Sequence, residues 1–355
     1  MRAFSSAVIS AVALLGGANA FFRLPCSGEP IIQTRIDPVI SPGQKPANHV
    51  HTVHGAKNFA SNATYATLRA STCTNCKDLS NYWFPKLYFR DPKTKQFEPV
   101  LNGGLLIYYL NRGDADVANG GAGLKAFPPG FKMISGNPRW RSKKFATETG
   151  TQDELRQRAT KWSCLRSGGN PSYTGYGFPT TDCENGFRAE LHMPSCWDGK
   201  NLDSADHVSH TAYLSGLDNG KCPSTHPVAH IHLFYEVTWD VHSFAGRWTA
   251  SDGWPFVYST GDPTGYSWHG DFQNGWDTAV LQKAIDTCNN PKDDTINGII
   301  EACKAFTLQD LTNTCKAVPE LSEVVTGKLA KLPGCNPIQA GPGDATLYSD
   351  SNCPA

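Results

Sequence analysis

The sequence predicts a mainly β protein, with an antiparallel sandwich or jelly-roll-like core, long disulfide-stapled loops and a short α-helical C-terminal region. Three observations lead to this fold class. Short β-prone runs recur between Gly, Pro, Asn and Asp, as in antiparallel sheets whose strands are joined by turns. The 355 residues include 33 Gly and 24 Pro but only three Met, which indicates a loop-rich chain. The twelve Cys permit complete pairing into disulfides.

The predicted strands come first along the chain and the predicted helices follow. We expect strands over Leu105–Leu110, Phe131–Ile134, Phe187–Met193, His230–Val241 and Phe256–Ser259. Apolar residues then recur at helical intervals over Ala279–Cys288 and Asp294–Phe306, with Asp277 and either Asp293 or Asp294 available as N-terminal caps.

A break in composition near residue 277 predicts the domain organisation. All nine Trp precede this position, and residues 277–355 contain neither Trp nor His. We therefore expect a signal peptide over residues 1–20, a core domain over residues 21–276 and a helical, Cys-containing extension over residues 277–355. Seven Cys fall before the boundary and five after it. Because both counts are odd, complete pairing requires a disulfide that ties the extension to the core.

The N-terminus indicates secretion. Met1-Arg2, an apolar run and Ala18-Asn19-Ala20 have the order of a secretory signal peptide, so we expect the mature chain to begin at Phe21. No later run is long enough to span a bilayer. The expected glycosylation site is Asn62. The 32 basic and 32 acidic residues balance, which argues against nucleic-acid or membrane partners. We expect a monomer whose partner is a polysaccharide or cell-wall glycan.

The histidines point to chemistry, since all eleven lie between His49 and His269. On an extended chain His49 and His51 point to the same face, where they can chelate a metal or transfer a proton. The alternative is that both are hydrogen-bonded beneath a loop. The expected metal ligands are His49, His51 and His210, and the cofactor is either a divalent metal or none.

A second polar motif runs from Asp206 to His210. A carboxylate beside an imidazole can fix its tautomer, and on a helical turn His207 and His210 share a face. The alternative is a solvated loop whose Asp and Ser residues cap turns.

Aromatic residues accompany these polar motifs, most densely over Gly261–Trp276. Their flat faces suit sugar rings, and neighbouring amides and carboxylates supply hydrogen bonds. The alternative is that the tryptophans fill the core. The predicted substrate-binding residues are Trp83, Trp197, Tyr266, Trp268, Asn274 and Trp276.

Together these motifs resemble a secreted fungal family known as a domain of unknown function, number nineteen ninety-six. The resemblance spans most of residues 36–276 and implies a fungal secreted protein, and it brings no established activity. It rests on Arg35-Ile36-Asp37-Pro38, His49-x-His51, Cys73-x-x-Cys76, Ser80-Asn81-Tyr82-Trp83, Pro194-Ser195-Cys196-Trp197-Asp198-Gly199-Lys200, Asp206-His207-x-Ser209-His210 and Gly270-Asp271-Phe272-x-Asn274-Gly275-Trp276.

The leading hypothesis is a carbohydrate-active enzyme that cleaves a wall or matrix polysaccharide by hydrolysis or β-elimination. Hydrolysis would use Asp206 and Asp271 as the carboxylate pair. Elimination would use His207 or His51 as the base and Tyr82 as the acid. The predicted catalytic residues are His51, Asp206, His207, His269, Asp271 and Tyr82. We expect all of these except Tyr82 to line one cleft together with His49 and His210, with Trp83 or Trp268 nearby. The alternatives are a non-catalytic glycan-binding or wall-structural protein and a His-liganded metal-binding protein.

Overall fold

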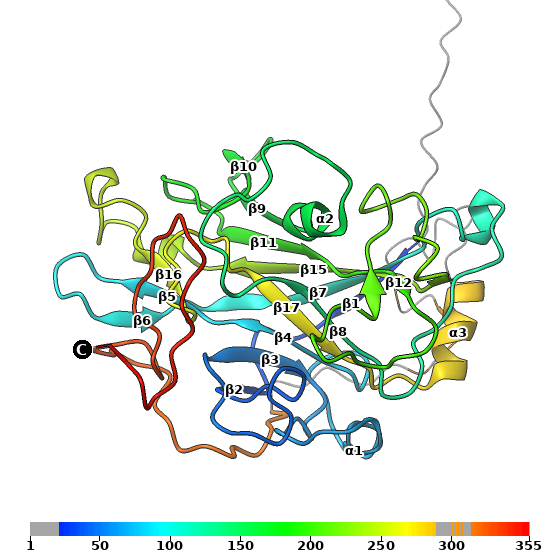
Figure 1. Ribbon diagram of the computed structural model, residues 1–355. Coiled ribbons are helices and arrows are strands. Elements are labelled where there is room, and N and C mark those ends of the chain that lie inside the picture. The colour runs from blue at the N-terminus through cyan, green and yellow to red at the C-terminus, as the bar shows by residue number, and fades with distance from the viewer. Residues whose placement is uncertain (1–20, 289–299, 301–302, 306, 308–313, 355) are drawn as a thin grey trace, which may run out of the picture.

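The protein folds mainly into antiparallel β-sheets (Figure 1), which confirms the predicted fold class. A computed structural model describes residues 21–288, 300, 303–305, 307 and 314–354. The expected signal peptide over residues 1–20 lies outside the described residues, as does most of the helix expected over Asp294–Phe306. In the described part of the chain, every helix is too short or too polar to cross a membrane.

Six strands form the larger sheet, and each pairs antiparallel with its neighbours. The strands predicted near residues 105, 187 and 230 are all found here. In spatial order the sheet consists of β1 (Phe21–Pro25), β7 (Asn102–Leu110), β15 (His232–Trp239), β11 (Phe187–His192), β9 (Thr160–Cys164) and β10 (Tyr173–Gly175).

Five strands form the second sheet, again antiparallel, and β4 is its central strand. The strand predicted near residue 131 belongs to it. In spatial order the sheet consists of β2 (Ile32–Thr34), β3 (His51–Gly55), β4 (Asn81–Pro85), β17 (His269–Gln273) and β8 (Lys132–Gly136).

The two sheets pack face to face around the main core, which makes the fold a β-sandwich. Phe84 on β4 meets Trp239 on β15 with ring centroids 5.8 Å apart, and Tyr82 meets Tyr235 at 5.9 Å. Gly270 on β17 is required at this interface, because a Cβ there would lie 2.6 Å from a Leu191 methyl carbon of β11. Aromatic pairs of this kind stabilise a core beyond the area that they bury.

The outer face of the five-stranded sheet is also covered. Because side chains alternate along a strand, Val53, Trp83 and Ile134 point away from the sandwich core. They pack into a second apolar cluster with the segment over residues 31–39, which includes β2, and with residues 315–317 of the C-terminal segment. This cover makes the outer face a protected surface on which polar groups can be held away from water.

Two small sheets and three helices complete the described fold. One sheet joins β16 (Phe256–Tyr258), β5 (Leu87–Arg90) and β6 (Phe97–Pro99), and the other joins β13 (Thr211–Ala212), β12 (Cys196–Trp197) and β14 (Val228–Ala229). The α-helices are α1 (Tyr65–Arg69), α2 (Gln152–Arg158) and α3 (Thr278–Thr287), and three-residue 3-10 turns begin at residues 117, 242 and 250. Asp277 caps α3 through the N–H groups of Ala279 and Val280, as the sequence predicts.

All twelve cysteines pair. Cys73–Cys315 joins positions on the two sides of residue 277 and closes 242 residues of sequence. The other disulfides are Cys26–Cys76, Cys164–Cys183, Cys196–Cys222, Cys288–Cys303 and Cys335–Cys353. The C-terminal segment is thus fastened to the sandwich at the face that carries β2 and β3.

Candidate metal centre

Three histidines meet on the covered outer face of the five-stranded sheet. His51 is the first residue of β3 and His269 the first of β17, with β4 between them. The antiparallel register places these two residues on either side of Pro85 at the end of β4. His49 lies two residues before His51, so the alternation of an extended chain brings both to the same side. The His-x-His motif therefore gains a third member from the far end of the domain.

The ring nitrogens of the cluster are close enough to share one ion. One nitrogen from each histidine lies within 4.8 Å of the other two. The Nε2 atoms of His49 and His269 are 3.1 Å apart. The ring centroid of His51 lies 4.3 Å from that of His49 and 6.1 Å from that of His269. A zinc–imidazole bond measures about 2.0 Å, so nitrogens around one ion stand roughly 3 to 4 Å apart.

Backbone carbonyls fix the tautomers of two of these rings. His51 Nδ1 lies 3.1 Å from the Ile36 carbonyl oxygen, and His269 Nδ1 lies 2.7 Å from that of Ser267. A carbonyl only accepts, so each Nδ1 carries the proton and donates it, and in the neutral ring each Nε2 keeps a free lone pair. Histidines that bind metals are commonly oriented in this way by a hydrogen bond to the other ring nitrogen.

Burial keeps the three rings neutral. It lowers the pKa of His51 to about 4 and that of His269 to about 4. The pKa of His49 falls well below its ordinary value, first through burial and then through repulsion by His51 and His269. Neutral imidazole is the form that ligates a metal, so no proton has to be displaced from these rings at neutral pH.

The three histidines line a small pocket with a volume of about 100 Å³. Asp271 lines this pocket with the histidines because it lies two residues beyond His269 on the same face of β17. Burial raises the pKa of Asp271 well above its ordinary value, and the nearby Asp37 carboxylate adds to the rise. Asp37 also lines the pocket, and its Oδ1 accepts the N–H groups of Val39 and Ile40.

Unpaired polar atoms are concentrated in this pocket. Among the described residues, fifteen buried side-chain nitrogen or oxygen atoms lack a hydrogen-bond partner. Four of them line this one site: Asn48 Oδ1, His49 Nδ1, His51 Nε2 and Asp271 Oδ2. A buried polar atom without a partner is costly, so such a concentration points to a bound species that supplies the missing contacts.

The Asp206–His210 motif lies apart from this cluster. Asp206 Oδ1 accepts hydrogen bonds from Ser204, Val208 and Ser209, so this exposed carboxylate caps its own loop. His207 pairs with Asp203 at 2.9 Å. Asp206 lines a different pocket, which shares only Ile134 with the histidine pocket.

His210, which was expected to bind a metal together with His49 and His51, does not belong to their cluster. Its Nδ1 contacts Ser204 Oγ at 2.9 Å, and its Nε2 contacts the Lys132 carbonyl oxygen at 2.7 Å. Both ring nitrogens are therefore occupied by the protein itself. The third histidine beside His49 and His51 is His269, which the sequence suggested only as a catalytic residue.

Most of the aromatic residues expected to bind substrate are buried in the cores. Trp83 and Trp268 are 0% exposed, and Trp276 is 5% exposed. The side-chain amide of Asn274 donates to the carbonyls of Phe127 and Pro128 and is also fully buried. The faces of Trp83 and Trp268 are not available to a sugar ring because packed side chains cover them, whereas Trp276 lines a separate pocket with little of its surface exposed.

Two further aromatic residues are half-buried and lie elsewhere. Trp197 stacks on His230, and its indole N–H donates to the Asn201 carbonyl. Tyr266 donates its hydroxyl to the Tyr176 carbonyl at 3.3 Å. Neither residue lines the histidine pocket.

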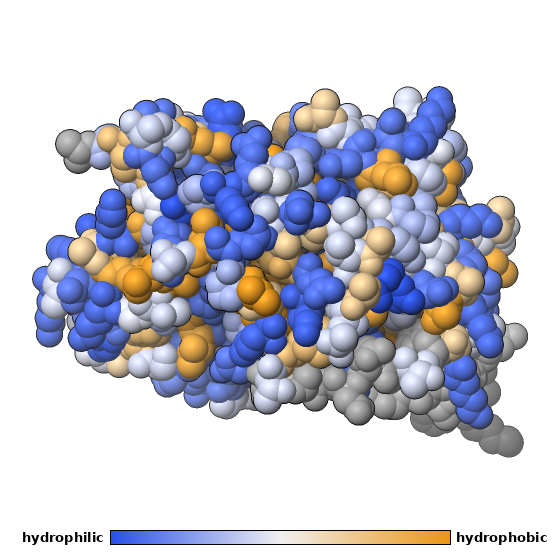
Figure 2. Space-filling model, turned by 90° about the horizontal axis from the view of Figure 1, so that it is seen from below, coloured by the Kyte–Doolittle hydropathy of each residue, from blue (hydrophilic) through white to orange (hydrophobic). Residues whose placement is uncertain are grey.

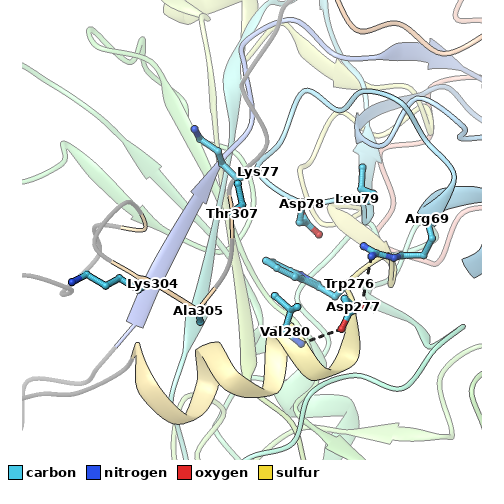
Figure 3. Close-up of a pocket in the computed structure, with 10 residues that line it drawn as sticks. All are labelled: Arg69, Lys77, Asp78, Leu79, Trp276, Asp277, Val280, Lys304, Ala305 and Thr307. Carbon is cyan, nitrogen blue, oxygen red and sulfur yellow. Dashed lines mark hydrogen bonds and ion pairs between the residues drawn. The ribbon is translucent and has the colours of Figure 1, made fainter.

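Tyr82 belongs to a buried network beside a larger pocket. Its hydroxyl lies 2.9 Å from both carboxylate oxygens of Asp78 and 2.7 Å from the Tyr109 hydroxyl, which accepts the indole N–H of Trp276. Figure 3 shows the pocket that Asp78 lines, with Trp276 near its centre and Arg69 reaching Asp277. This pocket has a volume of about 420 Å³ and does not include Tyr82. The contacts of Tyr82 are those of a structural residue.

A second histidine pair suits a metal less well. His192 Nδ1 and His232 Nε2 lie 2.9 Å apart near Asp218. However, the Arg112 guanidinium pairs with the Asp218 carboxylate at 3.0 Å. This fixed positive charge already neutralises the carboxylate and repels a metal ion. Of the two groups of potential ligands found among the described residues, the His49–His51–His269 cluster is the stronger candidate.

Asp37 and Asn48 both line the histidine pocket, although no sequence pattern predicted a role for them. Asp37 lies in one of the motifs that this chain shares with the family, and Asn48 directly precedes His49. The position of Asn48 next to the His-x-His motif was a usable signal. The contribution of Asp37 depends on how its loop folds over the sheet.

Fold and site together define a disulfide-bonded β-sandwich protein with a buried three-histidine cluster. The chain belongs to the protein family described as Domain of unknown function (DUF1996), which matches residues 37–276. The resemblance inferred from the motifs is thereby confirmed. Comparison with curated proteins and comparison with solved structures each found no significant match.

Proposed function

We propose that this protein is a metal-dependent hydrolase in which His49, His51 and His269 hold a single divalent ion, with zinc as the best fit. The observation that carries the proposal is the convergence of three neutral, buried imidazoles within 4.8 Å. An all-imidazole set suits zinc, and three protein ligands leave the fourth position of a tetrahedral ion open, as in catalytic zinc sites.

The neighbouring residues support hydrolysis. A zinc ion in such a site lowers the pKa of bound water and so supplies a nucleophile. Asp271 Oδ2 lacks a partner and lines the same pocket, so its carboxyl group would be available for proton transfer beside the ion. The carbonyls of Ile36 and Ser267 hold two ligand rings in a fixed orientation. The chain thus supplies a rigid ligand set and one carboxylate beside it.

The location and the substrate remain part of the proposal. Six disulfides fit a secreted protein, because disulfides form and persist in oxidising compartments. A wall or matrix glycan is still the candidate partner. Its support is weaker than the sequence suggested, because the tryptophans expected to stack on sugars are buried. The histidine pocket, rather than an aromatic cleft, is the place where we expect chemistry.

Zinc titration tests the proposal. Purified protein is stripped with a chelator, dialysed and titrated with zinc against a chromophoric competitor. We expect one zinc per chain in the wild type. His269→Ala and His51→Ala should each weaken zinc binding at least tenfold, because the site then has only two imidazoles.

The matched control is His226→Ala, which removes a half-buried histidine outside the pocket. This variant should bind zinc as the wild type does. Circular dichroism of every variant confirms that the sandwich remains folded. A wild-type protein that binds no zinc, or a His269→Ala variant that binds it unchanged, would refute the proposed centre.

A further inference from the structure

The pocket that the three histidines line also has apolar residues. Ile40, Ile134, Pro138 and Leu347 line it together with the histidines. Ile40 is 47% exposed and Leu347 48% exposed, and a residue that both lines a pocket and faces solvent stands at its rim. The rim therefore combines the loop after Asp37 with the C-terminal segment.

Figure 2 shows hydrophobic residues in small groups separated by hydrophilic ones on the face of the molecule seen from below, outside the area covered by grey atoms. That part of the surface offers no large apolar docking patch.

The volume limits what can enter. The pocket measures about 100 Å³. A protein cavity of about 150 Å³ holds a benzene ring with its six carbon atoms, so this pocket has room for roughly four heavy atoms. A sugar ring is too large for it. An acetyl group, with three heavy atoms, has the right size together with the oxygen of an attacking water, and the remainder of the substrate would lie outside the rim.

An unpaired acceptor in the pocket selects between kinds of acyl group. Asn48 Oδ1 is an acceptor without a donor. The Asn48 side chain is held in place because its Nδ2 donates to the Tyr348 carbonyl at 2.8 Å. An ester offers no donor to such atoms, whereas an amide offers one N–H. A site that leaves a buried acceptor unpaired with one substrate and paired with another discriminates strongly between them.

We propose that the pocket takes an acetamido group, so that the substrate class is an N-acetylated molecule from which acetate is released. This inference rests on the proposed metal centre. The acetyl methyl would contact Ile134 inside the pocket, and the amide N–H, which lies on the side of the larger molecule, would donate to Asn48 Oδ1. Hydrolysis adds one water: the acyl C–N bond breaks, a C–O bond forms to the water oxygen, and the water protons go to the released amine and the acid. Nothing is oxidised or reduced.

Hydroxamate binding tests the pocket without requiring turnover. Acetohydroxamate, butyrohydroxamate and octanohydroxamate are titrated into zinc-loaded protein by calorimetry. We expect acetohydroxamate to bind at least tenfold more tightly than octanohydroxamate. Leu347→Ala opens the rim and should reduce this preference at least threefold, whereas Leu101→Ala, which truncates a leucine that is 70% exposed elsewhere, should leave it unchanged.

Acetate release is the second measurement. N-acetylglucosamine oligomers and p-nitrophenyl acetate are incubated with the zinc-loaded wild type, Asn48→Leu and Leu101→Ala proteins. We expect acetate from the N-acetylated oligomers, at least a tenfold loss of that activity in Asn48→Leu, and a much smaller loss of ester cleavage. Affinity that grows with chain length, or cleavage of the ester alone, would overturn the acetamido assignment while leaving the zinc centre intact. Failure of zinc to bind would instead remove the proposed function itself.

Discussion

The Nε2 atoms of His49 and His269 lie 3.1 Å apart, although 220 residues separate the two histidines in the sequence. The contact exists because β3 and β17 flank β4 in one antiparallel sheet. Without a third group between them, one ring must donate to the other. Since His269 Nδ1 already donates to Ser267, His49 is the ring that donates through Nε2. A metal ion would replace this hydrogen bond with two coordinate bonds.

Acid should weaken the fold through buried histidines. Burial lowers the pKa of His230 to about 4, against an ordinary value of 6.5. Above pH 6.5 the ring is neutral in both the folded and the unfolded chain. As the pH falls from 6.5 to about 4, the unfolded chain binds a proton that the folded chain does not, so the free energy of unfolding decreases. His230 alone accounts for on the order of 3 kcal/mol over this range.

Replacement of His230 isolates this effect. His230→Phe and His230→Gln should each reduce the slope of unfolding free energy against pH by about 1.4 kcal/mol per pH unit within that window. Urea denaturation at a series of pH values measures the slope. Since the two replacements differ in shape but are both uncharged, a change of slope in only one of them would contradict the assignment.

The Tyr82 hydroxyl is predicted to stabilise the fold rather than to act in catalysis. Its removal in Tyr82→Phe leaves the buried Asp78 carboxylate without the donor that lies 2.9 Å from both of its oxygens. The expected loss of unfolding free energy is about 1 to 3 kcal/mol. Tyr266→Phe, which removes a half-buried hydroxyl with one long hydrogen bond, should cost less. Denaturant titration compares the two variants, and zinc affinity should stay unchanged in both.

The disulfide between the core and the C-terminal segment should contribute more to stability than a local one. Cys73–Cys315 closes 242 residues and Cys164–Cys183 closes 19. Constraint of the unfolded chain grows with the logarithm of loop length, which favours the long bridge by about 2 kcal/mol. Thermal unfolding of the two double Cys→Ala variants tests this difference. A larger loss of stability on removal of Cys164–Cys183 would show that native packing, rather than chain entropy, determines which disulfide contributes more.

Local sequence patterns were sufficient to predict several elements of this fold. Alternating runs bounded by turn residues predicted β7, β8, β11, β15 and β16, because side-chain period and turn chemistry are local properties of the chain. The Asp277 cap and the start of α3 followed from the same kind of signal. The odd cysteine counts required a bridge across residue 277, since parity depends on composition alone.

Which of the polar motifs lie close together in space depends on the tertiary fold and could not be predicted from the sequence. His49 and His51 are paired by local alternation, but the choice of His269 over His210 as their neighbour depends on the order of strands in the sheet. The sequence places Trp268 next to His269, yet one side chain lies in the sandwich core and the other in the pocket. Successive residues of a strand point to opposite faces of the sheet. Segments that are distant in the sequence cover each face, and they determine which face is filled with apolar side chains and which face keeps a cavity.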